Sequence, residues 1–146
     1  MGAAHVVYLG LGTNLGDKEA NIREAVKRIR ELVGAVMRQS ALYFSEPWGF
    51  QSDNSFVNAV VCCSTSLSPH EVLDITQKIE IEMGRRQKSS RDGSGKPVYH
   101  DRIIDIDILL YDDISLDTPD LVIPHPLINQ REFVNIPLRE IFLPKN

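Results

Sequence analysis

Two aspartates on one predicted strand are the residues of this sequence best placed to do chemistry. Asp105 and Asp107 lie in a stretch, residues 102–111, whose alternating apolar and acidic residues predict a β-strand. Successive strand side chains point to opposite faces, so the two carboxylates share a face and stand roughly 7 Å apart. Carboxylate oxygens are typical ligands of Mg²⁺, and paired charges that become buried need such a partner. The alternative is a solvent-facing strand with two ordinary surface acids.

Strict alternation has two further consequences for this strand. The residues expected on the face opposite the aspartates are Ile104, Ile106, Ile108 and Leu110. Arg102 would also lie opposite Asp105, so it must precede the regular strand or lie at a bulge to act beside the carboxylates.

A long polar segment leads into this strand. Residues 85–97 are rich in Gly and Ser and carry five of the sixteen basic residues. A loop of this length in a small domain is usually functional or disordered. A basic segment beside paired carboxylates suits a polyphosphate bound together with Mg²⁺, whereas a solvated linker is the alternative.

Three other features are candidate ligand contacts. Residues 45–54 are predicted to form a loop containing Trp48, the only tryptophan, which either binds a ligand or covers the core. Asn58 is unusual within a predicted strand and, if buried, needs hydrogen bonds from neighbouring backbone or from a planar heterocycle. His125 lies between two prolines that restrict the backbone, which favours a pre-placed ligand contact.

The elements that must position these residues follow a strand and helix pattern. Strands are expected at residues 6–11, 36–44, 56–64 and 102–111, and a tight turn at residues 12–17. Helices are expected at residues 22–33, from a Ser68 cap to Met83, and at residues 137–142, with Gly34 and Gly84 ending the first two. Asn14 or Asp17 is expected to cap the first helix.

Composition limits the class of protein. With 146 residues, 42% of them hydrophobic and 25% charged, the sequence predicts a single globular domain over residues 1–146. The net charge of −4 argues against a nucleic-acid partner, and no apolar run approaches the ~20 residues of a membrane span. The first residues lack a signal-peptide pattern, and nothing indicates an obligate protein partner. The only cysteines, Cys62 and Cys63, are adjacent, which excludes a disulfide framework and predicts a reducing, cytoplasmic setting.

Five motifs occur in an order that resembles a known enzyme family. They are Tyr43-x-Ser45-x-Pro47-Trp48-Gly49, Phe56-x-Asn58, Glu80-x-x-x-Gly84-Arg85, Arg102-x-x-Asp105-x-Asp107, and Pro124-His125 followed by Arg131-x-Phe133. Together they cover nearly the whole chain and resemble the 6-hydroxymethyl-7,8-dihydropterin pyrophosphokinases of folate biosynthesis. The resemblance implies that ATP gives its β,γ-diphosphate to the pterin hydroxymethyl group, leaving AMP. It also implies an α+β, ferredoxin-like βαββαβ fold with an antiparallel sheet, additional short strands and an additional helix.

The resemblance further implies roles for individual residues. Asp105 and Asp107 would hold two Mg²⁺ ions that bridge the phosphates of the co-substrate ATP, and with Arg102 and Arg85 they form the expected catalytic set. The expected ATP contacts are Gln77, Glu80, Arg85, Arg102, Ile108, His125 and Arg131, with Gln77, Glu80 and Ile108 around the nucleoside. The expected pterin contacts are Asn58 at the ring edge, Phe56 and Phe133 on its two faces, and backbone groups near Ser45 and Trp48.

One segment departs from the family pattern. The family commonly approaches the aspartate strand through Trp-Gly-Pro-Arg after a shorter basic loop, whereas this chain has Val-Tyr-His-Asp-Arg at residues 98–102. Tyr99 is the candidate to replace the tryptophan as a cover for the pterin. The phosphate clamp falls to Lys88, Arg91 or Lys96, and no sequence feature chooses among them.

Two other functional classes fit part of the pattern. A non-catalytic ferredoxin-like module that senses a nucleotide would keep the fold but would not need two metal-holding acids. A palm-type nucleotidyl transferase also places paired aspartates on a strand, but it needs a basic groove of nucleic-acid size, which the net charge of −4 disfavours.

Overall fold

A mixed set of helices and strands makes up the part of the protein that the computed structural model describes, which comprises residues 4–45, 55–84 and 103–142. In chain order the elements are β1 (His5–Thr13), α1 (Lys18–Leu32), β2 (Ala35–Gln39), β3 (Tyr43–Ser45), β4 (Phe56–Thr65), α2 (Pro69–Glu82), β5 (Asp105–Tyr111), β6 (Leu116–Thr118), β7 (Leu121–Ile123), a 3-10 helix η2 (Ile128–Gln130) and α3 (Glu132–Ile141).

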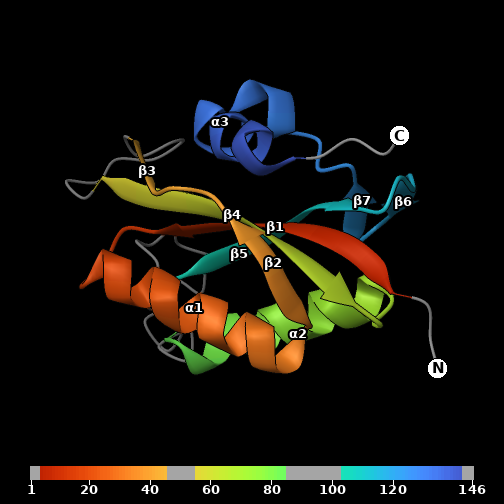
Figure 1. Cartoon of the computed structure of the whole chain (residues 1–146), viewed down its shortest axis with the longest axis horizontal. Helices are drawn as coiled ribbons and strands as arrows, with labels where there is room; N and C mark the ends of the chain where they lie inside the picture. Colours follow the sequence, from red (N-terminus) through yellow and green to blue (C-terminus); the bar gives the residue numbers. More distant parts are fainter. Residues whose placement is uncertain (1–3, 46–54, 85–102, 143–146) are drawn as a thin grey trace, which may run out of the picture.

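One antiparallel sheet organises the molecule. Its strands lie in the order β2-β4-β1-β5, with β3 also paired to β4, while β6 and β7 form a separate hairpin. The helices α1 and α2 cover one face of this sheet, and α3 lies on the other (Figure 1). The order of strands and helices is βαββαβ with an additional hairpin and helix, so the expected ferredoxin-like α+β fold is confirmed.

The face beneath α1 and α2 carries the main hydrophobic core. Alternate residues of β1, β4 and β5 point into it, among them Val7, Leu9, Val61 and Ile106, and α1 contributes Ile22, Ala25, Val26 and Ile29. Both helices have N-caps that the sequence predicts, although α1 begins at Lys18 rather than at residue 22. Asp17 caps α1 by accepting a hydrogen bond from the Ala20 N–H at 3.1 Å, and Ser68 and Glu71 form a capping box on α2.

The opposite face is covered by α3 over part of its length. A second apolar cluster there comprises Tyr8, Val60, Cys62, Leu109, Leu138 and Ile141. The remainder of this face, at the Asp105 end of β5 and the Thr13 end of β1, carries Gly10, Gly12, Phe56, Asn58, Asp105 and Asp107.

Gly34 ends α1 for a reason other than a left-handed turn. A side chain there would overlap the backbone carbonyl of Ser64, so the close approach of two backbones requires glycine. Gly84 does have a positive φ, of 150°, at the end of α2.

Several expected boundaries or placements are wrong. Residues 36–44 form two strands rather than one, because Ser40 leaves the regular ladder and its hydroxyl accepts a hydrogen bond from the Val60 N–H. The closing helix begins at Glu132 rather than Pro137, because packing of its apolar side on the sheet outweighs the proline in its interior. Leu110 lies on the α3 face rather than with Ile106 and Ile108, because β5 contains a bulge.

None of the described helices is long and apolar enough to cross a membrane.

Candidate active site

The two aspartates lie on the sheet face that α3 leaves partly uncovered. In β5 the side chains of Ile106 and Ile108 are buried in the core beneath α1 and α2, so Asp105 and Asp107 point to the opposite face, where both are half-buried. The predicted alternation of β5 is therefore confirmed from Asp105 to Ile108. The strand begins at Asp105, so strict alternation does not extend back to Arg102.

Glycines stand opposite both aspartates on the neighbouring strand. Gly12 pairs with Asp105 and Gly10 pairs with Asp107 in the β1–β5 ladder. On its other side Gly12 pairs with Asn58 of β4, so the amide and the Asp105 carboxylate flank a position without a side chain. The sequence pattern of residues 12–17 predicted a turn there, whereas β1 continues to Thr13. A glycine within a strand is the signal that could have identified this close approach.

Asn58 and Phe56, both expected to contact the pterin, lie around this glycine. Asn58 is only 5% exposed, and its Nδ2 donates a hydrogen bond to the Tyr43 carbonyl at 3.3 Å. A Cβ atom on Gly12 would lie 3.0 Å from Asn58 Oδ1 and 3.7 Å from Phe56 Cδ1. The backbone of β3 thus holds the amide, and the absence of a Gly12 side chain leaves space beside it.

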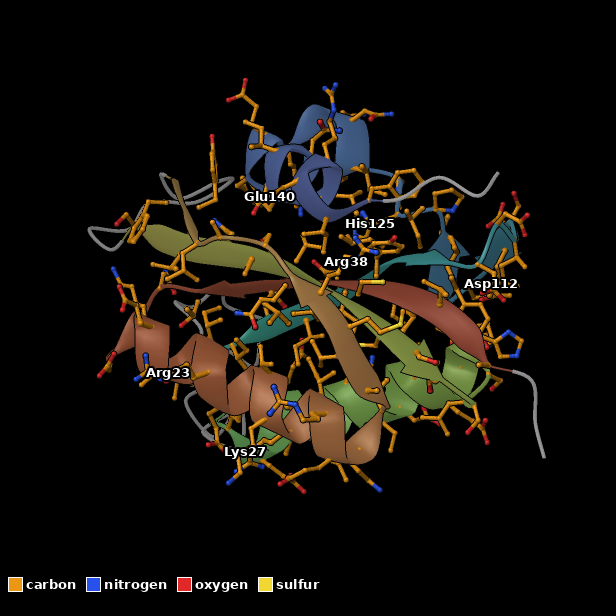
Figure 2. All side chains as sticks on the ribbon, viewed as in Figure 1. Arg23, Lys27, Arg38, Asp112, His125 and Glu140 are labelled. Atoms are coloured by element: carbon orange, nitrogen blue, oxygen red, sulfur yellow. The ribbon has the colours of Figure 1, made fainter. Side chains whose placement is uncertain are left out.

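The chain after β7 brings further predicted residues to the same face. The His125 N–H donates a hydrogen bond to the Leu109 carbonyl at 3.0 Å, which anchors this segment on β5. Figure 2 shows His125 on the α3 side of the sheet, while Arg23 and Lys27 project from α1 on the other side. Arg131 is at the N-cap position of α3, and its guanidinium Cζ lies 5.6 Å from the centroid of the Phe133 ring, in the range of a cation–π contact.

The environment of His125 favours its neutral form. Burial lowers the pKa of His125, the positive charge of Arg131 lowers it further, and the Asp105 carboxylate acts in the opposite direction. Arg131 and Asp105 therefore both act electrostatically on His125, although the three residues come from three separate segments.

The side chains expected around the nucleoside come from α2 and from the core face of β5, and not from the face that carries Asp105 and Asp107. Glu80 is 5% exposed on α2, and its Oε2 accepts a hydrogen bond from the Ile106 N–H at 2.7 Å. The Ile108 side chain is part of the core beneath α1 and α2, and Gln77 is exposed on α2. The backbone of Ile108, rather than its side chain, is thus the part that a ligand at the sheet edge could reach. Their contact with ATP stays a prediction.

Several predicted residues lie outside the described part of the chain. They are Trp48, Arg85, Lys88, Arg91, Lys96, Tyr99 and Arg102, together with the Ser45 side chain. The residues that border the segment 85–102 are described: a Cβ atom on Gly84 would overlap the Ile103 side chain, so the end of α2 lies against the residue that leads into β5. Arg85 and Arg102 are bonded in the sequence to these two neighbours.

The two carboxylates fit a Mg²⁺ site in which the protein supplies some of the ligands and a substrate supplies others. Within the described ranges, no group of three or more His, Cys, Asp or Glu side chains could hold a metal ion. Mg²⁺ is usually held by one or two carboxylates together with waters and substrate phosphates, and a pair of aspartates matches that donor set.

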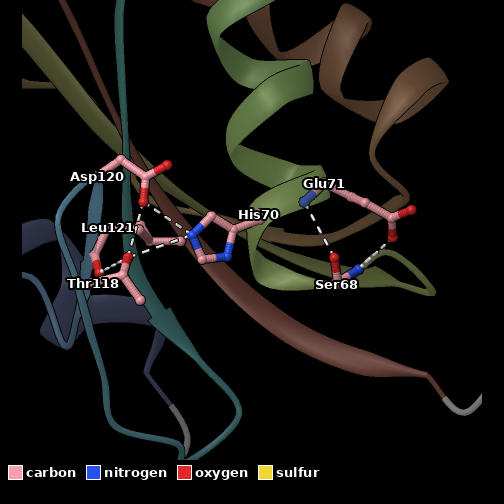
Figure 3. A network of polar contacts seen from close by, with 6 residues as sticks. All are labelled: Ser68, His70, Glu71, Thr118, Asp120 and Leu121. Atoms are coloured by element: carbon pink, nitrogen blue, oxygen red, sulfur yellow. Dashed lines mark hydrogen bonds and ion pairs between the residues drawn. The ribbon is translucent and has the colours of Figure 1, made fainter.

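A second polar cluster, at the start of α2, does not have the geometry of a catalytic triad. Thr118 Oγ1 and Asp120 Oδ1 both approach His70 Nε2, at 3.4 Å and 3.1 Å (Figure 3). A triad needs the hydroxyl and the carboxylate on different ring nitrogens. Thr118 also donates to Asp120 and to the Leu121 carbonyl, so these contacts attach the β6–β7 hairpin to α2.

Comparisons with known proteins show the family to which this chain belongs. Residues 8–143 match the family model of 7,8-dihydro-6-hydroxymethylpterin-pyrophosphokinase. Proteins described as 2-amino-4-hydroxy-6-hydroxymethyldihydropteridine pyrophosphokinase are similar in sequence. The relative from Porphyromonas gingivalis is 45% identical over 137 residues, covering 93% of this chain and 90% of the relative. The relative from Bacillus subtilis is 36% identical over 138 residues, covering 94% and 78%.

A solved structure has the same fold. The crystal structure of Plasmodium falciparum HPPK-DHPS matches with a TM-score of 0.69 at 17% identity, covering 95% of this chain and 41% of that longer chain. At this identity the match supports the fold alone. The family match over most of the chain and the sequence relatives place the protein in an enzyme family that carries out pyrophosphoryl transfer in folate synthesis. The chain belongs to the 7,8-dihydro-6-hydroxymethylpterin-pyrophosphokinase family.

Proposed function

We propose that this protein transfers the β,γ-diphosphate of ATP to the hydroxymethyl group of 6-hydroxymethyl-7,8-dihydropterin, with two Mg²⁺ ions at Asp105 and Asp107. The observation that carries the proposal is the cross-strand row of Asn58, Gly12 and Asp105, which sets a buried amide and a carboxylate on either side of an unfilled position. A flat heterocycle held by the amide would direct its substituent toward the carboxylates.

Asn58, Phe56 and Phe133 are proposed to bind the pterin. An amide can donate and accept hydrogen bonds at once, which suits the mixed polar edge of a pterin ring. The aromatic side chains would pack on the faces of the ring. Phe56 supports this role because it lies beside the same glycine as Asn58, on the same face of the sheet.

His125 and Arg131 are proposed to contact the phosphates of ATP, together with Arg85 and Arg102. Transfer of a phosphoryl-type group depends on positioning and charge stabilisation more than on a nucleophile from the protein. The hydroxymethyl oxygen would attack the β-phosphorus, the bond to the α–β bridging oxygen would break, and AMP would leave. Bound Mg²⁺ would neutralise phosphate charge and lower the pKa of the attacking hydroxyl. The phosphate clamp in residues 85–97 and a pterin cover by Tyr99 belong to the same proposal.

We also propose that residues 1–146 act as one pyrophosphokinase domain in the cytoplasm, with ATP and the pterin as partners and without nucleic acid or an obligate protein partner. Cys62 and Cys63 are free and buried, which is compatible with a reducing compartment.

A product assay tests the proposal. The protein is incubated with ATP, Mg²⁺ and 6-hydroxymethyl-7,8-dihydropterin, and AMP and ADP are separated. We expect AMP that depends on the pterin and disappears when the metal is chelated. ADP in place of AMP would indicate simple kinase chemistry, and ATP binding without turnover would indicate a nucleotide sensor.

A further inference from the structure

Two hydrogen bonds hold His125, one through its backbone and one through its ring, and the second determines which ring nitrogen carries the proton. Its backbone N–H donates to the Leu109 carbonyl at 3.0 Å, and its Nδ1 accepts from the Leu127 N–H at 3.1 Å. A ring nitrogen that accepts a hydrogen bond carries no proton, so in the neutral ring the proton is on Nε2. Protonation of Nδ1 would break the bond to Leu127.

The backbone of His125 is bound by the residue that forms the bulge in β5. Pairing between β1 and β5 passes from Tyr8–Leu110 to Leu9–Ile108, which leaves Leu109 as the extra residue. A bulge turns a residue out of the regular ladder, and the Leu109 carbonyl accepts the His125 N–H. The bulge therefore attaches His125 to β5 at Leu109, two residues after Asp107.

The other ring nitrogen is available to a ligand. No residue in the described ranges makes a hydrogen bond with His125 Nε2, although the ring is half-buried. The charged groups that act on the ring are Arg131, at the start of α3, and Asp105, on β5. Their opposite charges, together with burial, leave the neutral ring favoured.

We propose that His125 acts as a neutral hydrogen-bond donor, through Nε2–H, to an anionic oxygen of the nucleotide, and that it does not act as a positive charge. The identity of the ligand rests on the function proposed above, whereas the position of the proton rests on the geometry of the ring alone. Charge neutralisation is then left to the arginines and the metal, and His125 fixes the orientation of one oxygen. This makes it a contact whose geometry matters more than its charge.

Nitrogen NMR of the uniformly ¹⁵N-labelled protein near neutral pH tests the tautomer directly. The chain has four histidines, and the signals lost in His125→Gln assign the ring. We expect Nδ1 to resonate as a bare, pyridine-type nitrogen and Nε2 as a protonated one. A ring protonated on Nδ1, or on both nitrogens, would overturn the proposal.

Addition of Mg²⁺ and α,β-methylene ATP, in which the bond to be broken cannot break, tests the donor role. We expect the His125 Nε2–H signal to shift while Nδ1 remains a bare nitrogen. If the analogue binds without moving this signal, the donor role is wrong. If the wild-type protein instead binds the analogue and shifts the signal but forms no AMP from ATP, the proposed reaction fails while the proposal for His125 stands.

Two substitutions separate geometry from charge. The amide nitrogen of His125→Gln can reach the place of Nε2, whereas His125→Lys supplies a positive charge without a planar donor. Loss of a hydrogen bond to a charged group costs about 10- to 150-fold in rate, so we expect His125→Ala to lose this much kcat and His125→Gln to recover most of it. Greater recovery by His125→Lys than by His125→Gln would overturn the proposal.

Discussion

The two faces of one sheet have different compositions and, in our account, different tasks. The face beneath α1 and α2 is filled by apolar side chains, including those of Ile106 and Ile108. The other face is packed against α3 over part of its area and ends in glycines, a buried amide and two carboxylates. β5 contributes to both faces with alternate residues. The difference teaches that alternate positions of one strand can have separate roles: Ile106 and Ile108 stabilise the fold, whereas Asp105 and Asp107 are available to a ligand.

The largest expected effect is on activity, at Asp107. Asp107→Asn keeps the size of the side chain but removes a metal-binding charge, and we expect pterin-dependent AMP formation to fall by about 10²-fold or more. The urea midpoint should stay close to that of the wild type. Asp113→Asn, at an exposed position just after β5, is the control and should leave both quantities unchanged. Near-normal turnover in Asp107→Asn would remove Asp107 from the metal site.

The neighbouring residue should give the opposite result. Ile106 is buried in the core beneath α1 and α2, so Ile106→Ala should lower the free energy of unfolding by about 2–5 kcal/mol. The folded fraction should keep much of its activity. Urea unfolding and an AMP assay at low temperature would measure the two effects. A loss of turnover as large as that of Asp107→Asn, with unchanged stability, would break the division between the faces.

A smaller effect on stability is expected at Glu80. Glu80→Ala leaves the Ile106 N–H at the sheet edge without this acceptor, which should cost about 1–3 kcal/mol, and Glu80→Gln should restore most of it. Glu82, on the same helix, makes an exposed ion pair with Arg28 at 2.8 Å, so Glu82→Ala should cost at most about 1 kcal/mol. Equal unfolding free energies for the two alanine variants would contradict the role of the Glu80 hydrogen bond.

A substitution at Gly12 tests whether the space beside Asn58 is needed for pterin binding. In Gly12→Ala the new Cβ would lie 3.0 Å from Asn58 Oδ1 and push the amide from its position. A side chain forced off its rotamer costs about 0.5–1.5 kcal/mol, so we expect the KM for the pterin to rise about 2- to 12-fold. Gly10→Ala is the matched control, because the three atoms nearest its Cβ all belong to the Leu109 side chain, the closest at 3.4 Å. Equal pterin KM values in the two variants would argue against Asn58 as the pterin contact.

The smallest effect is a pH dependence of stability at His125. Its pKa in the folded protein is lowered, so between that value and the unfolded pKa of about 6.5 the unfolded chain binds more protons. Stability from this residue is present above about pH 6.5 and is lost as the pH falls. Urea unfolding at about pH 7.5 and about pH 5.5 should show a smaller acid loss in His125→Gln than in the wild type. An equal or larger loss of stability in the variant would contradict the predicted contribution of His125.

Much of the fold follows from patterns that are local in the sequence. The helix stripes, the capping box at Ser68 and Glu71, and the alternation through Asp105 and Asp107 each depend on residues a few positions apart. The fold class and the pairing of the two carboxylates on one face could therefore be predicted.

The remaining features depend on contacts between distant segments. The Leu109 bulge is defined only by the register with β1, and the alternation rule consequently placed Leu110 on the wrong face. Residues 12 and 13 have turn-like composition, but both pair with β4, and Gly12 also pairs with β5, which keeps them in β1. The hydrogen bond between Glu80 and the Ile106 backbone crosses 26 positions and leaves no local pattern.

The central claim is that the metal binds at Asp105 and Asp107, on the sheet face that α3 leaves partly uncovered. Locating the bound metal tests this claim most directly. Mn²⁺ accepts the same oxygen ligands as Mg²⁺ and broadens the amide NMR signals of the nearest residues. We would add small amounts of Mn²⁺ to the protein with α,β-methylene ATP and rank the signals by their loss. The account predicts that Gly10, Gly12, Asp105 and Asp107 are affected first. Earlier loss at Ala25 and Ile29 of α1, or at the cluster of His70, Thr118 and Asp120, would contradict it.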